Sequence, residues 1–230
     1  MTSVSIEQQS NRQAKKKQYS KPLMVMAEII SYVFHPVFFP ILMALMLYLL
    51  DPISFRGIPE KQINLWFITI IFSAVFIPLF AIALMKPLGF IGSFKMETAR
   101  ERTIPIMATM IFYFWVSHVF NSMQIPGIQV PLILKVLLLG NFWGIILVFL
   151  VNIFTKISMH TSVAGAMVGI ILVLMFMSRI NMAVPLFIAI GLAGLIGTAR
   201  LVLGAHQRGD IWVGYLIGIT VQLCAYWYMK

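Results

Sequence analysis

The sequence is poor in cysteine and in acidic residues. It has one cysteine, Cys224, and seven Asp and Glu residues against 17 Lys and Arg, so its net charge is +10. A single thiol excludes a disulfide framework within the chain and a site of several thiolates. The positive excess would suit nucleic acid, but no basic stripe with interleaved aromatic residues lies outside the apolar runs. We therefore expect no nucleic acid partner.

Charged residues of either sign are scarce, at 10% of the chain, whereas 60% of the residues are hydrophobic. A soluble domain of 230 residues could not bury so much apolar surface. The composition predicts a multi-pass membrane protein whose basic residues serve as topology signals and contact anionic lipids. Residues 1–22 read as a basic, disordered tail, without the cleavage site of a signal peptide, and residues 23–230 as one membrane domain.

The apolar runs predict an all-α polytopic membrane helix bundle. A span needs about 20 largely apolar residues, and no strand-like alternation occurs within the runs. Six to seven transmembrane helices are expected, because the third and fifth runs are short. The candidate spans are 29–50, 63–86, 104–122, 132–154, 161–178, 183–199 and 211–229.

The order of the spans predicts which loops share a side of the membrane. With seven spans, the N-terminal tail and the loops 87–103, 155–160 and 200–210 lie on one side. That side holds 12 of the 17 Lys and Arg residues. Because cytoplasmic loops carry an excess of Lys and Arg, we expect this side to be cytoplasmic. The expected location is the cell (inner) membrane.

Two polar stretches on this side contain candidate phosphate ligands. In "KMETARERTIP", Lys95 and Arg102 are seven residues apart, so two helical turns place them on one face. By itself this stretch also fits a basic loop that only sets topology. In "KISMHTS", Ser158 and His160 lie where a loop enters a span. The N-terminus of a helix presents free N–H groups and favours an anion.

A third stretch, "ARLVLGAHQRGDIWVG", is the richest in ionisable residues. His206 and Asp210 are four residues apart, so on a helix the carboxylate can reach the imidazole and fix its tautomer. Arg200 carries a planar guanidinium suited to phosphate oxygens. Ionisable groups at the edge of the hydrocarbon layer are costly and indicate a functional site. A charge network that only anchors the helix is the alternative.

Together, the patterns Lys-x6-Arg, Ser-x-His and Arg-x5-His-x3-Asp resemble the three signatures of the type 2 phosphatidic acid phosphatase (PAP2) superfamily. The resemblance covers the chain from Lys95 to Asp210 and keeps all the ionisable residues. The family's other signature residues differ here. Thr103 replaces a proline, Ile157 a proline, Met159 a glycine and Ala199 a serine. These departures indicate a divergent subfamily.

The resemblance implies a phosphatase that works through a phosphohistidine. His206 would be the nucleophile, Asp210 would stabilise its imidazolium, and His160 would be the acid and then the base. The phosphate would be bound by Lys95, Arg102, Arg200 and Ser158. No metal ion and no other cofactor are expected, as in the family.

The expected substrate is a lipid phosphate. A phosphate pocket at the mouth of a helix bundle suits a substrate whose headgroup is in water and whose hydrocarbon tail stays in the lipid. The candidates are phosphatidic acid, phosphatidylglycerophosphate, a polyprenyl diphosphate and lipid A. Two alternatives remain open: a non-hydrolytic transporter or flippase of anionic lipids, and a PAP2-like phosphotransferase. Membrane lipids are the other expected partners, and the oligomeric state is left open.

Two further features concern packing. Small residues recur four apart at Gly165/Gly169, Ala193/Gly197 and Gly214/Gly218, which predicts close helix contacts in the part of the chain that carries His160 and His206. The other two histidines, His35 and His118, have no charged residue at a useful spacing in the sequence. We interpret both as polar groups without a catalytic role.

Overall fold

The computed structural model describes residues 19–91, 99–177 and 180–230, with side chains omitted at 99–102. These residues form helices and short turns, without a β-strand among them, which confirms the all-α prediction. The helices are α2 (Lys21–Val33), α3 (Phe39–Leu50), α4 (Glu60–Ile70), α5 (Ile77–Met85), α6 (Ala99–Ser122), α7 (Leu132–Phe154), α8 (Met159–Met177), α9 (Ala183–Val202) and α10 (Arg208–Met229).

Seven segments within the described residues are long and apolar enough to cross a membrane, as the sequence predicts. They are Lys21–Leu50, Glu60–Met85, Thr103–Ser122, Leu132–Phe154, Met159–Met177, Ala183–Val202 and Arg208–Met229. The second joins α4 and α5 through a π-helical segment, Ile71–Phe76. The chain is therefore a multi-pass membrane protein.

The first span is broken rather than continuous, and it begins earlier than predicted. Helix α2 ends at Val33, a short turn covers Pro36–Phe38, and α3 follows. Pro36 and Pro40 lack the N–H that a continuous helix needs. Ala27 and Ser31 of α2 are buried, and Ala27 packs against Val202 and Ala199 near the end of α9. The break thus turns α2 toward α9.

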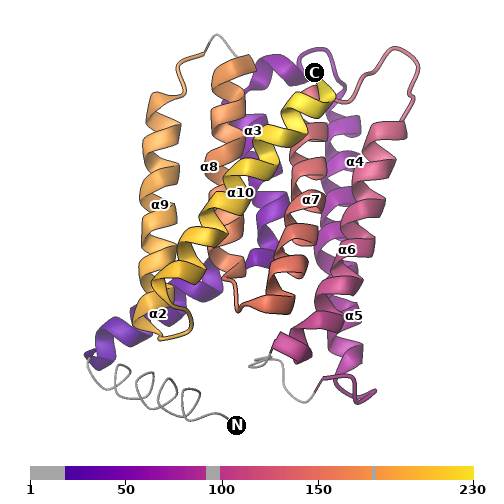
Figure 1. Ribbon diagram of the computed structural model, residues 1–230. Helices are drawn as coiled ribbons and strands as arrows, with labels where there is room; N and C mark the ends of the chain where they lie inside the picture. Colours follow the sequence, from indigo (N-terminus) through magenta and orange to yellow (C-terminus); the bar gives the residue numbers. More distant parts are fainter. Residues whose placement is uncertain (1–18, 92–98, 178–179) are drawn as a thin grey trace.

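Chain segments that are distant in sequence meet at one end of the bundle. Figure 1 shows α2, the end of α5, the start of α6 and the α9–α10 connection at the bottom, with the C-terminus at the opposite end. The α7–α8 connection faces the same way as the α9–α10 connection. We call this bottom end the N-terminal end. The described parts of the loops that span parity places on one side lie at this end.

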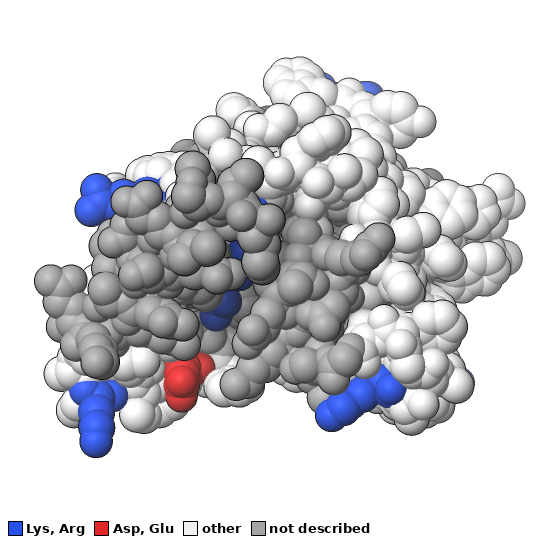
Figure 2. Space-filling view, turned by 60° about the horizontal axis from the view of Figure 1, so that its bottom comes forward, with Lys and Arg blue, Asp and Glu red and all other residues white. Residues whose placement is uncertain are grey.

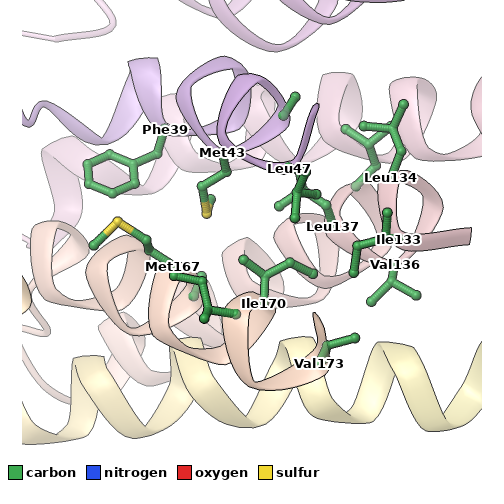
Figure 3. Packing of buried hydrophobic residues seen from close by; sticks show 14 of the residues in the cluster. Phe39, Met43, Leu47, Ile133, Leu134, Val136, Leu137, Met167, Ile170 and Val173 are labelled. Atoms are coloured by element: carbon green, nitrogen blue, oxygen red, sulfur yellow. The ribbon is translucent and has the colours of Figure 1, made fainter. Parts of the chain in front are cut away.

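The core of the bundle forms between α3, α7 and α8. Figure 3 shows Met43 and Leu47 of α3 facing Leu137 of α7 and Ile170 of α8. These residues are almost fully buried, at 2% exposure or less. Burying an aliphatic side chain of this size contributes about 1.5–3 kcal/mol. The layer holds α8 rigidly in the centre of the bundle.

Helices α8 and α10 approach each other through glycine. A Cβ atom at Gly165 would lie 2.8 Å from the Cα of Tyr215, and one at Gly169 would lie 2.9 Å from the Cα of Ile219. A Cβ atom at Gly218 would lie 2.7 Å from the carbonyl carbon of Gly165. The predicted small-residue contact is therefore present, and it sets the separation of the helices that follow Ser158 and His206.

Candidate functional site

His206 lies in the turn between α9 and α10. Gly204 in this turn has a φ of +61°, a left-handed conformation that suits glycine. The four-residue spacing predicts that His206 and Asp210 lie on one helix, but α10 begins only at Arg208, so His206 precedes it. The imidazole is still close to the carboxylate, because the Nδ1 atom of His206 lies 3.6 Å from Oδ2 of Asp210.

Asp210 is held in place by the start of α10. Its Oδ2 atom accepts a hydrogen bond of 2.9 Å from the backbone N–H of Gln207, and the Gln207 side chain completes a capping box. A capping box satisfies N–H groups that the first turn of a helix leaves free. The same carboxylate oxygen therefore caps the helix and faces His206. Nδ1 of His206 is the ring nitrogen that faces the carboxylate.

His160 occupies the first turn of α8. Its Nε2 atom lies 3.2 Å from the backbone carbonyl oxygen of Ser31 in α2. A carbonyl oxygen only accepts hydrogen bonds, so Nε2 of His160 carries the hydrogen in this contact. The other ring nitrogen, Nδ1, is then the one that exchanges a proton. Ser31 thus orients His160 in the way that Asp210 orients His206.

Arg200 comes from the last turn of α9 and meets the same residue of α2. Its Nη1 atom donates a hydrogen bond of 3.2 Å to the Ser31 hydroxyl. Its Nε atom is buried and has no hydrogen-bond partner among the described residues. An unsatisfied buried N–H is costly and points to a missing acceptor. An oxyanion bound beside Arg200 would supply one.

Arg200, His206 and His160 all line one cavity of about 720 Å³. The cavity begins at the N-terminal end and continues between the helices along walls that are mainly apolar. The wall residues include Phe39, Met43, Leu79, Ile82, Ile106, Ile145, Val148, Ala166 and Val221. None of the described residues that line it is acidic. The cavity therefore combines a cationic mouth with an apolar interior.

The space-filling view in Figure 2 shows the outer surface of the N-terminal end. Figure 2 shows Lys and Arg atoms below the outermost surface of this face. Further basic side chains appear toward the edges of this face, and an acidic side chain is also visible. The arrangement suits a negatively charged ligand that enters from this end of the bundle.

The described residues do not show the other three predicted phosphate ligands at the cavity. Lys95 lies outside them, and Arg102 belongs to α6 without a described side chain. Ser158 is fully buried, and its hydroxyl accepts a hydrogen bond of 3.4 Å from the N–H of Thr161. It caps α8 and does not line the cavity. The phosphate-binding roles of these three residues stay predictions.

Three residues at the cavity mouth were not proposed as site residues from the sequence. His35 and Lys156 line the cavity, and Ser31 bonds to both His160 and Arg200. Pro36 and Pro40 follow His35 and indicate a helix break at the membrane boundary. That signal could have revealed His35 from the sequence. Lys156 opens the same stretch as His160 and could have been found there.

Among the described residues, no group of three or more His, Cys, Asp or Glu side chains could hold a metal ion. Metal independence stays a prediction.

Residues 149–230 match the family model of the PAP2 superfamily. The match confirms the resemblance over the end of α7 and all of α8, α9 and α10, which carry His160, Arg200, His206 and Asp210. It does not extend to Lys95 and Arg102. No curated protein and no solved structure matches the chain.

Proposed function

We propose that the protein is a membrane-embedded phosphatase that hydrolyses the phosphomonoester or diphosphate of a lipid through a phosphohistidine. The PAP2 match supports a phosphatase-type family. The observation that carries the finer proposal is the cavity, in which two imidazoles and a guanidinium meet at the mouth of an apolar interior.

In the first half of the reaction, the lone pair on Nε2 of His206 attacks phosphorus. The bond from phosphorus to the leaving oxygen breaks, and that oxygen takes a proton from Nδ1 of His160. Asp210 stabilises the positive imidazole ring as the new bond forms, since its carboxylate oxygen lies 3.6 Å from Nδ1 of His206. The product is a phosphohistidine.

In the second half, His160 works in reverse. Its neutral Nδ1 takes a proton from water, and the water oxygen attacks the phosphorus of the phosphohistidine. The nitrogen–phosphorus bond breaks, its electron pair returns to His206, and inorganic phosphate leaves. The contact from His160 to the Ser31 carbonyl keeps the ring oriented through both halves.

Arg200 would stabilise the negative charge that the phosphoryl oxygens carry in the transition state. Its Nε is buried and lacks a partner among the described residues, so it is free to donate to an oxyanion. Loss of one such donor costs on the order of 10²–10³ in rate. Lys95 and Arg102 would add to this positive charge, and α6, which contains Arg102, starts at the N-terminal end.

A lipid is the substrate that fits the cavity best. Pockets for small ligands are mostly apolar with a few polar groups that set orientation. Here the polar groups lie at the mouth, and the interior wall is formed by side chains of several membrane-spanning helices. We propose that the phosphate lies at the mouth and that part of the hydrocarbon tail enters the bundle. By the distribution of Lys and Arg, this mouth faces the cytoplasm.

The proposal is tested by phosphate release from a panel of lipid phosphates by purified protein in detergent with EDTA. We expect activity in the wild type, none in His206→Ala, and a loss of about 10²–10⁴-fold in His160→Ala. His118→Ala is the matched control, because His118 stacks on Phe114 in α6, away from the cavity lining. Wild-type protein that binds these lipids and never releases phosphate would refute hydrolysis and favour a transporter.

A further inference from the structure

The cavity ends on a pair of amide side chains deep inside the bundle. Asn141 of α7 lines the cavity, and Nε2 of Gln222 in α10 donates a hydrogen bond of 3.1 Å to Oδ1 of Asn141. Along α7 the lining runs from Val148 to Gly140. Leu137, further along the same helix, belongs to the core layer of Figure 3. The pair therefore lies at the inner end of the cavity, opposite the mouth.

The depth of the pair places it near the middle of the membrane. Asn141 is 13 residues from Phe154, the last residue of α7. Gln222 is 14 residues from Arg208, the first residue of α10. At 1.5 Å per residue, each lies about 20 Å from the end of its helix at the N-terminal end. The hydrocarbon layer is about 30 Å thick. Polar side chains at this depth are costly and indicate a function.

The neighbouring helices make room for Gln222 with glycine. The Gln222 side chain is fully buried. A Cβ atom at Gly140 of α7 would lie 2.6 Å from Cδ of Gln222, and one at Gly169 of α8 would lie 3.1 Å from its Cβ. Two helices thus lack a side chain at the place where the Gln222 side chain lies. The packing accommodates this one polar group specifically.

The pair has one donor and one acceptor that are not used within it. Nδ2 of Asn141 and Oε1 of Gln222 are buried and have no hydrogen-bond partner among the described residues. Buried groups of this kind nearly always have a partner. A hydroxyl group both donates and accepts hydrogen bonds, so a single hydroxyl can pair with both amides. A methyl group can pair with neither.

An amide pair can also serve only to join two membrane helices. That role needs the bond between Asn141 and Gln222. It does not need the unused donor and acceptor, and it does not need a place on a cavity wall. The cavity and the two unused groups together therefore favour a ligand over a purely structural bond.

We propose that Asn141 and Gln222 form a hydroxyl-binding subsite at the inner end of the cavity, which selects lipid tails by the group that reaches it. The hydroxyl comes from water when the tail is short, or from the tail itself when its far end carries one. An apolar tail long enough to reach the pair displaces the hydroxyl and leaves both amides without a partner. Such a tail binds less tightly. This inference rests on the proposed function, because it places the tail of a lipid phosphate in the cavity.

The test compares alkyl phosphates that differ only at the far end of the tail, with the full chain purified in detergent. An extended hexadecyl chain is long enough to reach the pair, whereas a dodecyl chain ends in the apolar part of the cavity. We expect kcat/KM to be about tenfold to a hundredfold higher for ω-hydroxyhexadecyl phosphate than for hexadecyl phosphate, since the methyl end leaves two buried groups unpaired. Between ω-hydroxydodecyl and dodecyl phosphate the order should reverse, because that hydroxyl would be buried among apolar side chains.

Two substitutions of similar volume show whether the amides cause the preference. Asn141→Leu and Gln222→Met should each abolish the preference for ω-hydroxyhexadecyl phosphate over hexadecyl phosphate. Thr198→Val is the matched control, because Thr198 is exposed on α9 and lies outside the cavity lining. It should keep the wild-type ratio. The ratio of two substrates is the readout, so a general loss of activity or stability does not imitate the effect.

The two proposals fail in different ways. If wild-type protein releases phosphate from none of the four substrates, the proposed function fails, and binding of the two hexadecyl phosphates still tests the subsite. If it hydrolyses them without preferring ω-hydroxyhexadecyl phosphate, the subsite is wrong and the proposed function stands. A preference that persists in Asn141→Leu and in Gln222→Met would also overturn the inference. Should Gln222→Met not fold, Asn141→Leu decides the question, because it removes the unused donor.

Discussion

Gly218 is the position where one added methyl group tests how the site is held together. An alanine Cβ at this position would overlap the carbonyl oxygen of Ser162 and the nitrogen of Ala166, and it would lie 2.7 Å from the carbonyl carbon of Gly165. All three are backbone atoms of α8, which do not move independently of the helix. Gly218→Ala therefore requires α10 and α8 to separate.

The size of the shift follows from these contacts. Ordinary contacts of a Cβ atom begin at 3.4 Å, so the Gly165 carbon alone requires a separation of about 0.7 Å. Overpacking of this kind costs about 1–3 kcal/mol of folding free energy. Helix α8 begins beside His160 and α10 begins just after His206, so their spacing changes too. A misplacement of about 1 Å costs on the order of a hundredfold in rate.

We expect kcat/KM of Gly218→Ala to fall about tenfold to a hundredfold, together with a lower unfolding temperature. The assays are phosphate release and thermal unfolding in detergent. Gly191→Ala is the matched control, because Gly191 also lies within a helix, α9, and its added Cβ would have no neighbour within 4 Å. Wild-type activity in Gly218→Ala, or an equal loss in Gly191→Ala, would refute this account of the contact.

Three further outcomes follow from the site. Asp210→Asn should lower kcat about tenfold to a hundredfold, because it removes the charge beside His206 while its amide oxygen still caps α10. An unchanged kcat would contradict that role of Asp210. Ser31→Ala should weaken vanadate inhibition about threefold to tenfold by releasing Arg200, and Ser31→Thr should restore it; equal inhibition in all three proteins would contradict the positioning. Gly204→Ala should lower the free energy of unfolding by about 1–2 kcal/mol because of its positive φ, and unchanged thermal unfolding would contradict that.

The number and order of the spans could be predicted because they depend on length and hydropathy alone. The start of the first span could not be predicted in this way. The apolar run predicts a start at residue 29, whereas the segment begins at Lys21. Helix α2 has only a few buried positions, and its place depends on packing against α9 through Ala27. Such a contact between distant parts of the chain leaves no periodic signal within either part.

Closeness in the chain also decides which site residues could be predicted from the sequence. Arg200, His206 and Asp210 lie close together in the chain, and span parity brings His160 to their side. His35 was set aside because no charged residue lies near it in the sequence. Its neighbour in space, His160, is 125 residues away. The break at Pro36 creates that contact.

Ser158 shows a different limit. Its motif indicates a hydroxyl beside His160, but a hydroxyl at the start of a helix can cap the helix instead of binding a ligand. In the structure it lies against Thr161. The pattern of residues is the same for both roles, so only coordinates distinguish them.

A structure of the full chain with bound orthovanadate would test most directly whether both imidazoles act on one phosphorus atom. Vanadate takes the five-coordinate geometry of phosphorus under attack. We expect vanadium bonded to Nε2 of His206, with one axial oxygen beside Nδ1 of His160 and an equatorial oxygen accepting from Nε of Arg200. Vanadate bound away from His206, or with His160 out of reach of its oxygens, would contradict it.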